Sequence, residues 1–166
     1  MLAAPLLVLL AGCATLSTAD ARSRDLREWF EAHPFSKSCD ALWPDVLRTA
    51  AARGFPLSAS DAKLLGEAPG GALGELVSAA NRTYRTADGG LTSATDWNRE
   101  SGTRLRMTAT PAGENACRVR FDVIAGGVTT ADEFAMGPDW DLDVMLLRRV
   151  SPDEAARLEA KTPSGR

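Results

Sequence analysis

The cysteines carry the clearest chemistry in this chain, because a thiol can be acylated, oxidised to a disulfide or bound to a metal ion. Cys13 follows the apolar run 2–10 and two small residues. That run is far shorter than the roughly 20 residues of a membrane-spanning helix, and a short apolar run closed by small residues is typical of a cleaved secretory signal peptide. A buried helix, the alternative, would carry polar residues at helical spacing, and residues 1–12 have none. We therefore predict a signal peptide over residues 1–12.

The segment Leu10-Ala11-Gly12-Cys13 resembles the lipobox of bacterial lipoproteins, in which a small residue precedes an invariant cysteine. This resemblance implies that the signal peptide is removed and that Cys13 becomes the lipidated first residue, which anchors the protein in a membrane. Asp after the cysteine marks inner-membrane retention in many Gram-negative lipoproteins, and Ala14 stands there instead. The resemblance therefore implies the outer membrane, facing the periplasm. The true start codon stays open, because no Lys or Arg precedes the apolar run.

Two further cysteines, Cys39 and Cys117, remain once Cys13 is acylated. In an oxidising compartment an even pair predicts a disulfide, and the alternative is two buried free thiols. The bond would close a loop of about 78 residues and stabilise the fold by roughly 4 to 5 kcal/mol at most. We expect no metal and no cofactor, because the single histidine, His33, cannot complete a four-ligand set with two cysteines without carboxylate help.

Two neighbouring segments, 103–110 and 116–124, alternate between apolar and polar residues, which predicts a β-hairpin with the loop 111–115 between the strands. The apolar positions, including Cys117, would face the core. Four arginines would share the outer face of the hairpin: Arg104, Arg106, Arg118 and Arg120.

These four arginines are a candidate site for an anion. If Thr110 pairs with Ala116, Arg104 faces Asp122 and Arg106 faces Arg120. Like charges directly opposite each other are destabilising, so a bound anion or a nearby acid would relieve the second pair. The expected ligand is an anionic envelope polymer, such as lipopolysaccharide or peptidoglycan, or an acidic envelope protein. The alternative is a solvated strand face.

Asp139, Asp141 and Asp143 have the spacing that opens a calcium-binding EF-hand loop, but Val144 and Val150 stand where that loop needs Gly and Glu. A helix explains the three acids better, because acids near a helix N-terminus interact favourably with its dipole. The chain contains none of the common serine-hydrolase, β-lactamase, zinc-protease or phosphate-loop motifs. We therefore expect a protein that is not an enzyme.

The elements that position these residues follow from hydrophobic periodicity and from capping residues. Pro44 is tolerated only in a first turn, so regular helix is expected from about Trp43 onward. We expect Trp43 and Trp97 to fill the core. The predicted helices span 24–32, 38–54, 73–84, 138–150 and 151–161, and the predicted strands span 55–60, 91–99, 103–110 and 116–124.

This order predicts an α+β fold in which an antiparallel sheet of about three to five strands is packed on one face by helices. A single domain over 24–166 would follow a lipidated cysteine and flexible tether over 13–23. In outline the fold is similar to the helix-grip domains of BamC-type assembly lipoproteins, which implies a binding or scaffolding module.

The alternative is a carrier that holds a lipid or small apolar ligand between sheet and helix, in a cavity lined by Leu105, Met107 and Phe121. The net charge of −3 is too weak to indicate nucleic acid as a partner.

Overall fold

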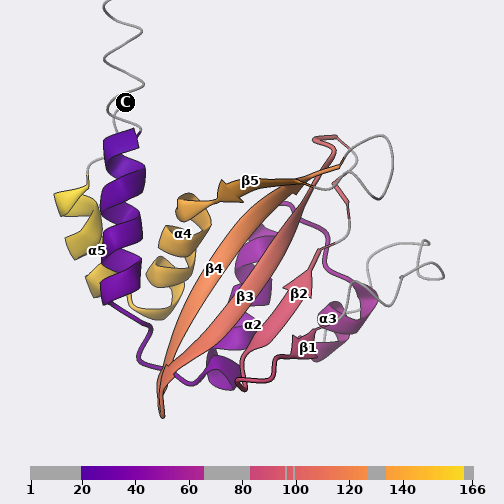
Figure 1. Cartoon of the computed structure of the whole chain (residues 1–166), viewed down its shortest axis with the longest axis horizontal. Helices are drawn as coiled ribbons and strands as arrows, with labels where there is room; N and C mark the ends of the chain where they lie inside the picture. Colours follow the sequence, from indigo (N-terminus) through magenta and orange to yellow (C-terminus); the bar gives the residue numbers. More distant parts are fainter. Residues whose placement is uncertain (1–19, 66–82, 96, 99, 127–133, 163–166) are drawn as a thin grey trace, which may run out of the picture.

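Five antiparallel strands in the order β1-β2-β3-β4-β5 form the sheet of this α+β protein, and helices pack on one of its faces (Figure 1). The computed structural model describes residues 20–65, 83–95, 97–98, 100–126 and 134–162. The strands are β1 (Tyr84–Arg85), β2 (Leu91–Ala94), β3 (Thr103–Gly113), β4 (Ala116–Ala125) and β5 (Phe134–Pro138). The helices are one over residues 20–32, then α2 (Cys39–Ala52), α3 (Ala59–Leu64), α4 (Trp140–Val150) and α5 (Pro152–Lys161).

The central helix, α2, packs its buried stripe against β2, β3, β4 and α4. Ser38 caps its N-terminus by accepting a hydrogen bond from the Ala41 amide at 3.3 Å. Gly54, with φ of +89°, ends the helix in a left-handed conformation that favours glycine. The expected start near Trp43 is wrong, because the helix already begins at Cys39 and carries Pro44 in its interior.

A disulfide between Cys39 and Cys117 joins the first turn of α2 to β4, as predicted. The Cα atoms lie 5.1 Å apart, and both cysteines are buried. Just before the helix, Phe35 pairs with Cys117 through two backbone hydrogen bonds of 2.9 and 3.0 Å. The start of α2 and strand β4 are therefore held together by one disulfide and by one pair of backbone hydrogen bonds.

The β3–β4 hairpin forms as predicted, but its register differs. The strands continue to a two-residue turn at Glu114 and Asn115, with an irregularity between Pro111 and Gly113. Thr110 therefore pairs with Arg118 instead of Ala116. A longer hairpin of this kind adds ladder hydrogen bonds that the expected five-residue loop would leave out.

Three other boundaries correct the expectations. The helix before α2 includes residues 20–23, which were expected to belong to the flexible tether over 13–23. Residues 55–60 form no strand, because Ser58 caps α3 by accepting from the Asp61 amide at 3.1 Å. β5 includes Pro138, where the predicted helix over 138–150 was expected to begin, and α4 begins at Trp140 instead.

The C-terminal helices form close to their predicted positions. Asp139 caps α4 by accepting from the amides of Asp141 and Leu142. Pro152 stands in the first turn of α5, where its missing amide hydrogen is tolerated, and the Ser151 side chain makes no capping hydrogen bond to the described residues. In Figure 1, α4 lies between α2 and the pair formed by α5 and the helix over residues 20–32.

The expected helix over 73–84 lies outside the described residues up to residue 82, and Tyr84 belongs to β1. The predicted signal peptide over 1–12 and Cys13 also lie outside them. Within the described part of the chain, none of the helices is long and apolar enough to cross a lipid bilayer.

Candidate functional site

The outer face of the β3–β4 hairpin carries the four predicted arginines, as the alternating burial of both strands shows. Leu105, Met107 and Phe121 face inward and are fully buried. Arg106 and Arg120 point outward and are exposed. The helices cover the opposite face of the sheet (Figure 1), so this face is the open side of the described fold.

The register removes the like-charge pair that suggested an anion site. Arg106 lies opposite Asp122, and Arg104 lies opposite Ile124. Arg120 lies opposite Thr108, and its Nε donates to Asp122 Oδ1 at 2.8 Å. Asp122 therefore supplies the nearby acid between two of the arginines.

The other two arginines also have local contacts. Arg118 donates from Nε to the carbonyl oxygen of Glu31 at 3.3 Å, which satisfies an acceptor in the last turn of the helix over residues 20–32. The Arg104 guanidinium lies 5.1 Å from the centroid of the Trp97 ring, a cation–π distance. The four arginines share one face, but the structure distributes them among separate contacts.

Trp97 lies half-buried beside Arg104, so the expectation that it fills the core is wrong. A Cβ on Gly126 would lie 3.0 Å from the Trp97 ring, which shows how closely the ring covers the backbone at the end of β4. Trp43, in contrast, is buried in the core as expected. Trp97 lies next to a residue of the open face, where it can contribute an aromatic surface.

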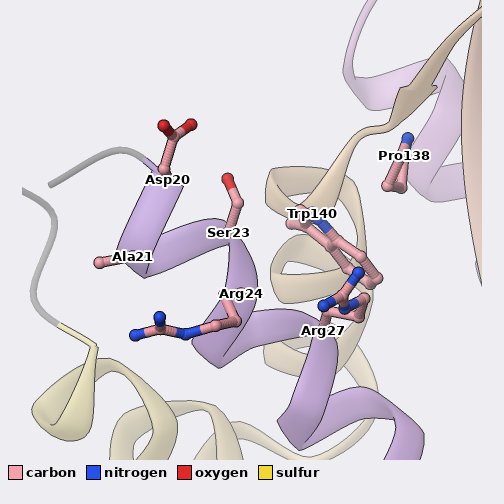
Figure 2. Close-up of a pocket in the computed structure, with 7 residues that line it drawn as sticks. All are labelled: Asp20, Ala21, Ser23, Arg24, Arg27, Pro138 and Trp140. Atoms are coloured by element: carbon pink, nitrogen blue, oxygen red, sulfur yellow. The ribbon is translucent and has the colours of Figure 1, made fainter. Parts of the chain in front are cut away.

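An open groove of about 580 Å³ lies between the helix over residues 20–32 and the start of α4 (Figure 2). Trp140 and Pro138 line one side, and Arg24 and Arg27 belong to the helix. In Figure 2 the Arg27 side chain extends toward Trp140, whereas Arg24 extends to the opposite side. Both arginines are exposed, and Arg24 makes an ion pair of 3.6 Å with Asp25. Sequence periodicity missed this groove, because it depends on how two distant segments pack.

Asp61 is a buried carboxyl with a complete set of polar neighbours. Thr83 Oγ1 donates to Asp61 Oδ1 at 2.6 Å, and Ser93 Oγ donates to Oδ2 at 2.7 Å. The Thr83 oxygen also accepts from the Trp43 indole nitrogen at 3.0 Å. This network connects α2, α3 and β2, and we assign it a structural role.

Asp143 is the second buried carboxyl, and its surroundings are different. It is 0 % exposed, and among the described residues neither of its carboxyl oxygens has a hydrogen-bond partner. Burial raises the pKa of Asp143 well above its ordinary value, and the negative charges of Asp139 and Asp122 act in the same direction, whereas Arg120 opposes them. Sequence analysis placed Asp143 among the acids at a helix start but did not predict its burial.

The three aspartates at the start of α4 therefore do different things. Asp139 caps the helix, Asp141 accepts from Arg22 at 2.9 Å, and Asp143 is buried. In the described part of the chain, no three His, Cys, Asp or Glu side chains are placed to share a metal ion.

His33 is exposed. Its ring stacks on Trp29 with 4.7 Å between centroids, and Nδ1 lies 2.9 Å from the Trp29 carbonyl oxygen. Both contacts are local to one helix end.

Comparisons with known proteins add no family: no protein-family model matches the chain, and no curated protein or solved structure matches it significantly.

Proposed function

We propose that this chain is a bacterial envelope lipoprotein, anchored through Cys13, whose folded part is a non-enzymatic binding or scaffolding module. The observation that carries the proposal is the buried Cys39–Cys117 disulfide. Structural disulfides persist in oxidising compartments and are rare in the cytosol. An exported location agrees with the signal peptide and lipobox that residues 1–13 resemble.

The anchor would consist of acyl chains instead of a protein segment. Each buried CH₂ contributes about 0.8 kcal/mol, and stable attachment takes more than one chain. Lipidation at Cys13 would supply several chains and hold the folded part at the membrane. Ala14 after the cysteine supports the outer membrane, with the module in the periplasm.

The open sheet face is the surface we propose for a partner. Arg106 and Arg120 are exposed there, and Arg104 stacks on the half-buried Trp97. Guanidinium groups bind carboxylates and phosphates in a bidentate geometry. The partner class is therefore an acidic surface of another envelope protein, or an anionic envelope polymer.

The core packing favours a binding surface over a carrier. A carrier of lipid or apolar ligand needs space between the sheet and α2, next to Leu105, Met107 and Phe121. These three side chains are fully buried within one continuous apolar cluster that includes α2 and α4. The 580 Å³ groove lies elsewhere, beside Trp140.

The proposal is tested by expressing the full-length chain in a bacterial host, fractionating its membranes, and cross-linking before purification through a C-terminal tag. Wild type is compared with Cys13→Ala and with Arg106→Glu/Arg120→Glu. We expect wild type in the membrane fraction, Cys13→Ala in the soluble fraction, and envelope partners that the arginine double variant loses. A wild type that stays soluble would contradict the anchor, and partners retained by the double variant would exclude the sheet face.

A further inference from the structure

We propose that the open sheet face binds an extended acidic segment of a partner protein, with a carboxylate on every second residue of that segment. The residues that would bind it form an arginine row along the hairpin: Arg104, Arg106, Arg120 and Arg118. This inference rests on the partner surface of the proposed function, and it specifies the conformation and the charge pattern of the partner. It does not depend on the anchor at Cys13.

The arginine row follows from the register of the β3–β4 hairpin. β3 carries the first two arginines, and β4 carries the other two, opposite Thr108 and Thr110. The four arginines therefore occupy successive levels of one face, two residues apart, first on one strand and then on the other. Levels two residues apart are separated by about 7 Å along a strand, and the diagonal step from Arg106 to Arg120 is about 7 to 8 Å.

The spacing of the arginine row matches that of an extended polypeptide. Alternate side chains of an extended chain point to the same side and lie about 6.6 to 6.8 Å apart. A segment of about seven residues that runs along the hairpin can therefore present one carboxylate to each arginine. Guanidinium and carboxylate groups form bidentate, charge-assisted hydrogen bonds. This match favours a polypeptide over an envelope polymer, whose charges do not follow a two-residue repeat.

The three exposed arginines of the row can reach a ligand. Arg106 makes no hydrogen bond or ion pair with the residues that the structure describes. Arg118 and Arg120 donate from Nε to the Glu31 carbonyl oxygen and to Asp122 Oδ1, at 3.3 and 2.8 Å. These two bonds orient the side chains without using the terminal nitrogens, which can pair end-on with a carboxylate.

The charge of this face is complementary to an acidic segment. Asp122 is the one acidic residue in the described strands, and its side chain is only 15 % exposed. Glu100 and Glu114 lie in the turns before β3 and between β3 and β4, and Glu31 lies on the helix beside Arg118. These three acids lie off the face, at the ends or the side of the arginine row. They would repel a longer acidic chain, so they limit the acidic segment to about the length of the row.

The test measures the binding of two labelled synthetic peptides to the full-length chain, purified in detergent, by fluorescence anisotropy at low salt. Both peptides contain four glutamates and three threonines. Glutamate and threonine alternate in the first peptide, and the four glutamates are consecutive in the second. We expect the alternating peptide to bind roughly tenfold more tightly, because only two of the consecutive glutamates can face the row of arginines. Added salt should weaken the binding.

Matched variants locate the binding site. Arg106→Gln/Arg120→Gln removes the centre of the arginine row, and the control Arg53→Gln/Arg149→Gln removes two exposed arginines at helix ends. We expect the first variant to bind the alternating peptide roughly tenfold more weakly and the control to bind it as wild type does. Equal affinity of wild type for the two peptides, or equal affinity of the two variants for the alternating peptide, would overturn the inference.

The same assay with labelled lipopolysaccharide separates this inference from the proposed function. Lipopolysaccharide that binds wild type but not Arg106→Gln/Arg120→Gln, where neither peptide binds wild type, would overturn the acidic segment and leave the partner surface intact. If wild type binds neither the peptides nor lipopolysaccharide, both the acidic segment and the partner surface on the sheet are overturned.

Discussion

The helical layer has two parts, one formed by α2 and α3 and one by α4, and the buried polar groups in these two parts have different surroundings. Where α2 and α3 meet the sheet, Asp61 accepts from Thr83 and Ser93, and the Cys39–Cys117 disulfide links helix to strand. Where α4 meets the sheet, Asp143 is equally buried, but its carboxyl oxygens have no partner among the described residues. Burial of a polar group costs little when its hydrogen bonds are made and several times more when they are not. The polar contacts around α2 therefore stabilise the fold, whereas the buried Asp143 on α4 destabilises it.

The largest expected effect is loss of the disulfide. Cys39→Ala/Cys117→Ala should lower the free energy of unfolding by about 4 kcal/mol, because a 78-residue loop in the unfolded chain is no longer closed. Urea unfolding measures this change. Wild type in reductant should fall to a similar stability, whereas the double variant should not respond to reductant. A double variant as stable as oxidised wild type would show that the α2 half does not depend on this link.

Truncation of the two buried aspartates compares the halves directly. Asp61→Ala should destabilise the fold by about 3 kcal/mol, because Ser93 and Thr83 lose the acceptor that satisfies them. Asp143→Ala should change stability by less than about 1 kcal/mol, because no hydrogen bond is lost. Urea unfolding of both variants at pH 7 provides the measurement. Equal losses in the free energy of unfolding would contradict the proposed difference between a hydrogen-bonded Asp61 and an unsatisfied Asp143.

The pH dependence of stability should separate Asp143 from other acids. Its pKa is raised in the folded state, so the folded protein keeps a proton that the unfolded chain releases. Stability from this group is present below the unfolded pKa and falls as pH rises toward the folded value. Asp143→Asn should therefore match wild type near pH 4 and become increasingly more stable than wild type as the pH rises to 8, because its neutral amide has no proton to lose. A constant difference between pH 4 and pH 8 would contradict a buried, protonated Asp143.

The smallest expected effect concerns helix caps in the two halves. Ser38 Oγ accepts from the Ala41 amide, so Ser38→Ala should cost about 1 kcal/mol. Ser151 makes no side-chain capping bond, so Ser151→Ala should cost only a few tenths of a kcal/mol. Thermal unfolding of both variants checks the difference. A larger loss for Ser151 would mean that its side chain caps α5 in solution.

Local patterns predicted the parts of the fold that local physics determines. Alternation in β3 and β4 placed Leu105 inward and Arg106 outward, and cysteine parity predicted the disulfide. The hairpin register was missed, because a two-residue turn with an irregularity near Pro111 shifts every pair without changing the faces. The short α3 was also missed, although Ser58 and Asp61 stand three residues apart as a helix-start signal.

The candidate sites were less predictable than the fold. The shared face of the arginines followed from alternation, but their neighbours across the strands did not. Asp122 lies opposite Arg106 only in the observed register, and Trp97 reaches Arg104 only through packing. The Asp143 environment depends on how α4 folds back on the sheet, which no local pattern contains. The groove beside Trp140 likewise joins segments more than a hundred residues apart.

The most direct test of the account is the intact mass of the protein purified from bacterial membranes after treatment with a thiol-alkylating reagent. We predict the mass of residues 13–166 plus the lipid groups on Cys13, with no alkylation, because Cys39 and Cys117 are oxidised. A chain that keeps residues 1–12 and carries an alkyl group on Cys13 would contradict the proposed lipoprotein.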